Sequence, residues 1–137
     1  MLESLAMSAV MMLPRADIPE YQVPKVYQAF EKCVSWRESR RKPDAVNPTG
    51  KYRGMYQMDH AIASGATHWI VDWLGTWHRT PKKYAAALRA TPVNKWPRQV
   101  QTAVFVVTLD GHDRNERWSG ASHWYYSGSR CNGLVKR

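Results

Sequence analysis

Three prolines that stand at the start of apolar-periodic segments divide this chain into helices more firmly than any other feature. Pro24, Pro81 and Pro97 each come just before a segment with apolar residues at helical spacing. Proline is favoured at the first position of a helix, where its missing N–H is not needed. We therefore predict helices over residues 24–38, 81–89 and 97–109, the last ending at Gly111. A further helix is expected over residues 59–73.

A turn-rich segment separates the first two helices. Residues 42–58 contain two prolines and two glycines, which favour loops and tight turns over regular helix. We therefore expect an α+β, mainly α, protein with a small lobe of loops and short strands inserted after the first helix. Within that lobe the run from Gly54 to Gln57 is expected to form a strand, with Tyr56 facing the core and Gln57 the opposite side.

The N-terminal part is expected to lie outside the domain. Residues 14–24 carry three prolines, so the chain divides into an arm or linker over residues 1–23 and one domain over residues 24–137. An apolar run over residues 5–13 is too short to span a membrane and lacks the basic lead-in of a secretory signal. We expect a short amphipathic helix there, and no membrane span elsewhere.

The formal net charge of +9 favours an anionic partner through long-range attraction. Nucleic acid and a cell-wall polymer bearing phosphate or carboxylate are both candidates. No recognition helix, zinc finger or RNA-binding signature accompanies the basic residues, which disfavours nucleic acid. Seven Trp and seven Tyr against two Phe suit the binding of sugar rings, although the same residues also fill cores. The five His show no metal-site spacing, and we expect neither a metal nor a cofactor.

Cys33 and Cys131 are the only cysteines. If they are bonded, they tie the first helix to the C-terminal tail and indicate an oxidising, extracytoplasmic site of action. In the chain-entropy account, closing so long a loop stabilises the fold by about 4–5 kcal/mol. Two buried free thiols are the alternative.

Glu38 is the leading candidate for a catalytic residue. It lies one turn beyond Val34, on the apolar side of the first helix, so it is expected to face the core or the floor of a cleft. A carboxylic acid in a partly apolar pocket can protonate a glycosidic oxygen. A surface glutamate beside Arg37 and Arg40 is the alternative interpretation.

The residues that follow Glu38 resemble a known family. The lysozyme-like transglycosylases, in particular the soluble lytic transglycosylases and the resuscitation-promoting factors, show Glu-Ser, Asn/Asp-Ala-x-x-Pro-x-Gly and Gly-Leu-x-Gln in this order. The resemblance covers about residues 24–131. Here Met55 replaces the usual Leu, the family's Ala-Tyr-Asn-x-Gly motif is missing, and a basic run over residues 40–42 replaces small or polar residues. The matching segments are Glu38-Ser39, residues 44–50 and residues 54–57, with Gln99 or Gln101, Gly111, Trp118 or Trp124, and Cys131 as later candidates.

The resemblance implies a lysozyme-like fold and cleavage of the β-1,4 bond between N-acetylmuramic acid and N-acetylglucosamine in bacterial peptidoglycan. Glu38 would protonate the bridging oxygen and then accept a proton from the 6-hydroxyl as a 1,6-anhydro ring closes, without a cofactor. A hydrolase of the two-carboxylate kind would need a second carboxylate across the cleft, and Asp44 and Asp59 are the candidates. Simpler roles for them are a turn for Asp44 and a helix N-cap for Asp59. Substrate contacts are expected from Ser39, Asn47, Thr49, Tyr52, Gly54 and Gln57.

A wall substrate without a secretion signal suits a phage protein that is carried on the virion or released at host lysis. The arm would then dock on a neighbouring virion subunit. Two other interpretations stay open: a non-catalytic wall-binding or structural domain that keeps a lysozyme-like fold, and a basic nucleic-acid-binding domain.

Overall fold

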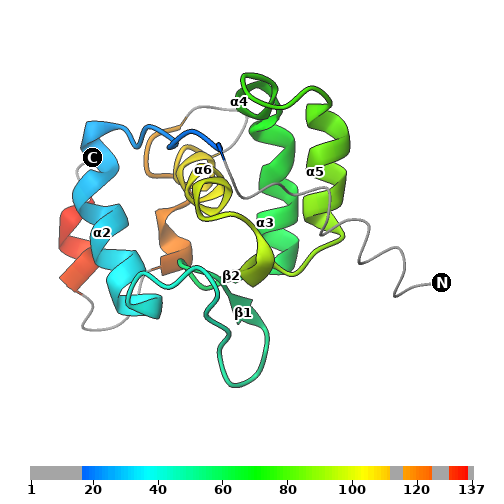
Figure 1. Ribbon diagram of the computed structural model, residues 1–137. Helices are drawn as coiled ribbons and strands as arrows, with labels where there is room; N and C mark the ends of the chain where they lie inside the picture. Colours follow the sequence, from blue (N-terminus) through cyan, green and yellow to red (C-terminus); the bar gives the residue numbers. More distant parts are fainter. Residues whose placement is uncertain (1–16, 112–115, 125–129, 136–137) are drawn as a thin grey trace.

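The structure, a computed structural model, describes residues 17–111, 116–124 and 130–135 (Figure 1). It is mainly helical with one small two-stranded sheet, as the sequence predicted. The α-helices are α2 (Lys25–Ser39), α3 (His60–Ala66), α4 (Val71–Gly75), α5 (Pro81–Arg89) and α6 (Arg98–Leu109). The 3₁₀ helices are η1 (Thr67–Trp69), η2 (Val93–Lys95), η4 (Ala121–Trp124) and η5 (Arg130–Leu134), and the strands are β1 (Tyr52–Arg53) and β2 (Met58–Asp59).

The three helices that prolines were expected to open are confirmed. Pro24 and Pro97 take the N-cap positions of α2 and α6, and Pro81 is the first residue of α5. Gly111 follows α6 with a φ of 71°, a left-handed conformation that glycine adopts at low cost just past a helix end.

The helix predicted over residues 59–73 is broken into α3, η1 and α4. At the break the hydroxyl of Thr67 donates to the Ser64 carbonyl at 2.6 Å, and the Ile70 N–H bonds to the Thr67 carbonyl at 3.3 Å. Side-chain bonds of this kind compete with the regular helical pattern. On the two sides of the break, Trp69 is exposed while the rings of Trp73 and Trp77 pack together.

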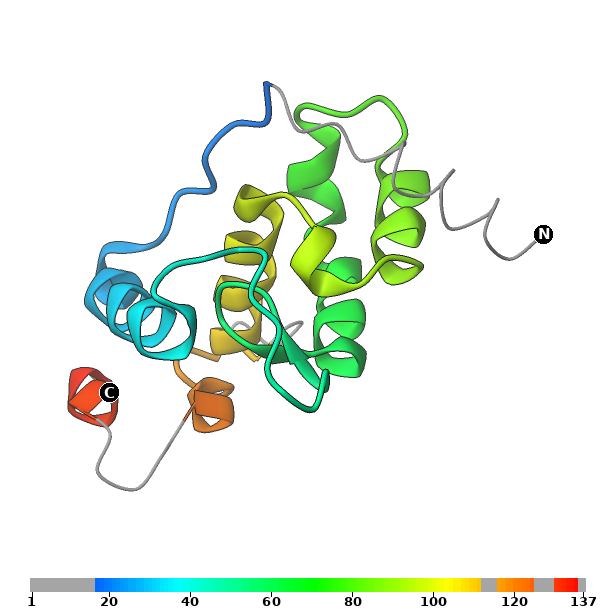
Figure 2. The same ribbon diagram turned by 60° about the horizontal axis from the view of Figure 1, so that its bottom comes forward.

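Helix α6 runs through the middle of the molecule. Figures 1 and 2 show α2 on one side of it and α3, α4 and α5 on the other. The Phe105 ring of α6 stacks on Tyr56, with centroids 4.2 Å apart, and lies 6.2 Å from the Phe30 ring of α2. Burial of large apolar side chains stabilises a fold by about 1.5–3 kcal/mol each. This core joins α2, α6 and the small lobe.

The small lobe is an antiparallel hairpin. Residues Tyr52 and Arg53 pair with Asp59 and Met58 respectively. The run Gly54–Gln57 is the turn between the strands rather than a strand, which corrects the sequence prediction. The Gln57 N–H bonds to the Gly54 carbonyl at 3.2 Å, and both residues have positive φ. Tyr56 is buried in the core, as expected.

The chain before α2 lies along the body of the molecule. Ile18 is buried, Glu20 forms an ion pair with Arg98 of α6, and the Tyr21 ring contacts Trp73 of α4 at 5.2 Å between centroids. Residues 1–16 of the predicted arm lie outside the described residues. The division into residues 1–23 and 24–137 stays a prediction. None of the helices in the described ranges has the length and apolar character needed to cross a membrane.

Candidate functional site

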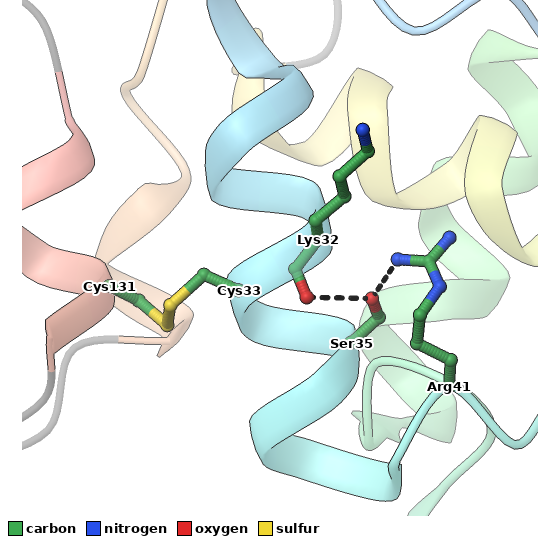
Figure 3. The surroundings of a disulfide bond; sticks show 5 residues. All are labelled: Lys32, Cys33, Ser35, Arg41 and Cys131. Carbon is green, nitrogen blue, oxygen red and sulfur yellow. Dashed lines mark hydrogen bonds between the residues drawn. A yellow bond between two sulfur atoms is a disulfide. The ribbon is translucent and has the colours of Figure 1, made fainter.

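A disulfide between Cys33 and Cys131 joins α2 to η5 (Figure 3). The two Cα atoms are 5.6 Å apart and the residues are 98 positions apart in sequence. The sequence left this bond and two free thiols open, and the structure contains the bond. The disulfide holds η5 beside the last two turns of α2, where Glu38 lies.

The C-terminal end of α2 is closed by two arginines in the left-handed conformation. Arg40 has a φ of 56° and Arg41 a φ of 62°, and their N–H groups bond to the carbonyls of Trp36 and Ser35 at 2.9 and 3.0 Å. This conformation costs a residue with a side chain roughly 1–2 kcal/mol. The chain therefore reverses immediately after Glu38 and Ser39, so these two residues lie at the outer end of the helix.

Glu38 is partly buried and lines a cavity of about 630 Å³ between α2 and η5. The guanidinium carbon of Arg40 lies 4.7 Å from the centre of the Trp36 ring, which is the most exposed large apolar side chain among the described residues. A volume of this size falls in the range of small-molecule and sugar sites. The described residues that line the cavity are Cys33, Trp36, Arg37, Glu38, Arg40, Arg130 and Cys131.

Ser39 connects the end of α2 to the turn of the small lobe. Its hydroxyl donates to the Met55 carbonyl at 2.8 Å and accepts from the Lys42 N–H at 3.0 Å. The two segments that the family resemblance had singled out, Glu38-Ser39 and residues 54–57, are thus joined by a direct hydrogen bond. The bond fixes the position of the backbone next to Glu38.

Gln101 of α6 supports the same turn from inside. Its side-chain oxygen accepts from the Met55 N–H at 2.7 Å, and its nitrogen donates to the carbonyls of Pro43, Val93 and Trp96 at 3.0–3.1 Å. A Cβ atom on Gly54 would lie 2.5 Å from the Gln101 oxygen. A side chain at position 54 would therefore clash with Gln101, which explains the glycine. Gly54 is buried, which disfavours its expected contact with sugar, and that contact stays a prediction.

A buried polar network lies behind the turn. Glu31, the one buried charged side chain among the described residues, accepts from the Tyr56 hydroxyl at 2.8 Å and pairs with Arg41 at 3.1 Å. Tyr56 also bonds to the Thr102 hydroxyl at 3.0 Å, and Arg41 bonds to Ser35 (Figure 3). Burial, followed by the nearby charge of Glu31, raises the pKa of Tyr56. This network anchors the Arg41 turn that ends α2.

Asn47 and Thr49 shape the loop before β1. The Asn47 side-chain oxygen accepts from the Thr49 hydroxyl at 3.1 Å and from the Tyr52 N–H at 3.2 Å. The Gln57 amide nitrogen donates to the Gly54 carbonyl at 2.9 Å and to the Ala45 carbonyl at 3.4 Å. These contacts hold the lobe together, and the substrate contacts expected of the same residues stay predictions.

Gln57 and Tyr52 line a second, smaller cavity of about 220 Å³ with Asp59 and Trp124. The Trp124 indole N–H donates to the Tyr56 carbonyl at 2.8 Å. Glu38 therefore lines one cavity and Gln57 another, and the two cavities share no described lining residue. The other C-terminal candidate, Trp118, is buried against α2, and its ring centroid is 4.6 Å from that of Tyr27 in this helix.

Neither candidate for a second carboxylate lines the described wall of the Glu38 cavity. The Asp59 carboxylate accepts from the Ala61 N–H at 2.8 Å and caps α3, as expected. Asp44 is exposed and lies in a separate depression with Asn94 and Trp96. Glu38 is therefore the one carboxylate among the described residues that line its cavity.

Sequence reasoning missed three residues that shape this region. Glu31 lies seven residues before Glu38, so the two share a face of α2, and that spacing could have identified it. Trp36 lies on α2 one turn after Cys33, and Arg130 is next to Cys131, so the possible bond between the two cysteines was the signal that could have placed both near Glu38. Gln101, rather than Gln99, supports the turn; Gln99 instead bonds to Ile18 at 3.4 Å. Within the described ranges, no group of three His, Cys, Asp or Glu side chains could hold a metal ion.

Searches among known protein families, characterised proteins and solved structures found no significant match.

Proposed function

We propose that this protein cleaves the glycan strands of bacterial peptidoglycan, as a lytic transglycosylase with a lysozyme-like fold. The observation that carries the proposal is the hydrogen bond from Ser39 to the Met55 carbonyl at 2.8 Å. It joins the Glu-Ser pair to the Gly-x-x-Gln turn, the two segments on which the family resemblance rests. Beside this joint Glu38 lines a cavity of about 630 Å³.

In the proposed reaction Glu38 works first as an acid and then as a base. It donates a proton to the oxygen that bridges the two sugars while the bond from C1 to that oxygen breaks. The carboxylate then takes the proton of the 6-hydroxyl, whose oxygen bonds to C1 and closes the 1,6-anhydro ring. No water is consumed and no second carboxylate is needed. The positions of Asp44 and Asp59, away from the described lining of the cavity, support this scheme over two-carboxylate hydrolysis.

The proposal includes the place where the protein acts. A disulfide such as Cys33–Cys131 persists in oxidising surroundings, which suits action on a cell wall outside the cytoplasm. A phage protein that is carried on the virion or released at lysis would meet its substrate there, with residues 1–23 as the segment that docks on a virion subunit.

The direct test is mass spectrometry of the products from purified bacterial wall. The parent protein, Glu38→Gln and the control Glu116→Gln would be compared, because Glu116 is an exposed glutamate outside the cavity. We expect anhydro-muropeptides from the parent and the control and none from Glu38→Gln. Products with reducing ends would indicate hydrolysis and a second carboxylate. Wall binding without cleavage by any of the three would establish the non-catalytic alternative.

A further inference from the structure

The cavity beside Glu38 has a positively charged lining. Arg37 and Arg40 come from α2 and Arg130 from η5, while Glu38 is the only carboxylate of the described lining. Even if Glu38 engages one of these guanidinium groups, two positive charges remain. Arg40 and Arg130 are both exposed, so an anion entering from solvent can reach them. Guanidinium groups match the planar geometry of a carboxylate particularly well.

The cavity also offers an apolar platform next to these charges. Trp36 is 54% exposed, and Arg40 lies across its ring at 4.7 Å. With Arg40 over one face of the indole, the exposed remainder of the ring can hold a sugar ring while the guanidinium reaches an acidic substituent of that sugar. The Cys33–Cys131 disulfide joins the two walls, so the backbone positions that carry these side chains are set before a ligand arrives.

We propose that this groove binds a carboxylate of the peptide that hangs from the muramic acid residue, and that the enzyme therefore prefers peptide-bearing strands over bare glycan. This inference rests on the proposed function. Wall phosphate is a poorer occupant, because phosphate on the 6-hydroxyl of the reacting sugar would block closure of the anhydro ring. The peptide leaves that hydroxyl free.

A carboxylate that pairs with Arg40 and Arg130 also offsets their charge beside Glu38. The acidic substituent of the substrate would thus complete the charged lining of the cavity.

Binding can be tested without turnover. The ¹⁵N-labelled Glu38→Gln protein would be titrated with a reduced disaccharide-tetrapeptide and with the same compound whose carboxyl groups are amidated. The reporter is the indole N–H signal of Trp36, identified by its loss in Trp36→Phe. We expect a saturable shift with the free acid and about tenfold weaker binding of the amide, from the loss of charge-assisted hydrogen bonds.

Variants locate the contact. Arg40→Gln and Arg130→Gln should each bind the free acid several-fold more weakly, while Arg79→Gln, an exposed arginine outside the cavity lining, should bind like the parent. Equal binding of acid and amide, or an equal shift with inorganic phosphate at the same concentration, would overturn the inference. So would wall cleavage by the parent with no muropeptide binding, which leaves the proposed function standing. Binding without any cleavage would overturn the function and keep the carboxylate site.

Discussion

Two glutamates lie two turns apart on the same face of α2 and have opposite surroundings. Glu31 is buried, pairs with Arg41 at 3.1 Å and accepts from the Tyr56 hydroxyl at 2.8 Å. Glu38 is partly buried and faces an open cavity of about 630 Å³. The first carboxylate is occupied by internal partners, and the second can reach a ligand. The comparison shows that a carboxylate's surroundings, more than its place in a helix, decide whether it serves stability or chemistry.

The two glutamates are also linked. Arg41, the partner of Glu31, is one of the two left-handed residues that end α2 just after Glu38. The buried pair offsets the conformational strain of that turn, and the turn places Glu38 at the rim of the cavity. Glu31 is thus linked to the position of Glu38 through the backbone of this turn.

The strongest test of this comparison is to make the same substitution at Glu31 and at Glu38. Glu38→Gln should lower the rate of wall cleavage by about 10²–10⁴-fold, the usual contribution of a general acid or base, and leave the free energy of unfolding unchanged. Glu31→Gln should lower the free energy of unfolding by about 1.5–3 kcal/mol, because it removes hydrogen bonds to a buried charge. Urea denaturation and product analysis by mass spectrometry measure the two effects.

Rates measured well below the unfolding transition keep these effects apart. If Glu31→Gln abolished cleavage while its stability stayed at the parent value, Glu31 would be the catalytic acid and the assignment would be reversed. Loss of stability in Glu38→Gln would show that this residue belongs to the structural network.

The next largest effect concerns the disulfide that forms one wall of the Glu38 cavity. Replacing Cys33 and Cys131 together by Ala should lower the free energy of unfolding by up to about 4–5 kcal/mol in the chain-entropy account. Cleavage should fall as well, because η5 would no longer be held against α2. The parent treated with a reductant should match the double variant in urea denaturation. An unchanged cleavage rate in the folded variant would show that η5 contributes nothing to the site.

The smallest expected effect is the alkaline response of the Glu31 network. Burial and the charge of Glu31 raise the pKa of Tyr56, so the unfolded chain loses this proton first, near pH 10. The stabilisation is complete below that pH and is lost as the pH rises further. In Tyr56→Phe the free energy of unfolding should fall less steeply above pH 10, by up to about 1.4 kcal/mol per pH unit. Tyr27 and Tyr84, whose pKa values are also raised, are present in both proteins and cancel. Equal slopes in the two proteins would show that Tyr56 ionises normally in the folded state.

The helical framework could be predicted from the sequence because its signals are local. Pro24, Pro81 and Pro97 mark the starts of three helices through the fixed geometry of one residue. The buried position of Tyr56 and the capping role of Asp59 followed in the same way from their neighbours.

Local sequence signals gave the wrong secondary structure where side chains from distant segments form hydrogen bonds with the segment concerned. The run Gly54–Gln57 alternates like a strand, yet Gln101 and Ser39 take up the Met55 N–H and carbonyl and hold it as a turn. The helix over residues 59–73 breaks at Thr67, which also accepts a bond from Arg89 of α5.

The sequence by itself determined where α2, α5 and α6 begin and which cysteines were available to bond. Only the tertiary structure decided that Glu31 is enclosed, that Glu38 faces a cavity, and that Arg130 stands across that cavity from Arg40. The reason is physical. Propensity and capping act over a few residues, whereas burial and electrostatic surroundings are set by side chains up to a hundred positions away that packing and one disulfide bring together.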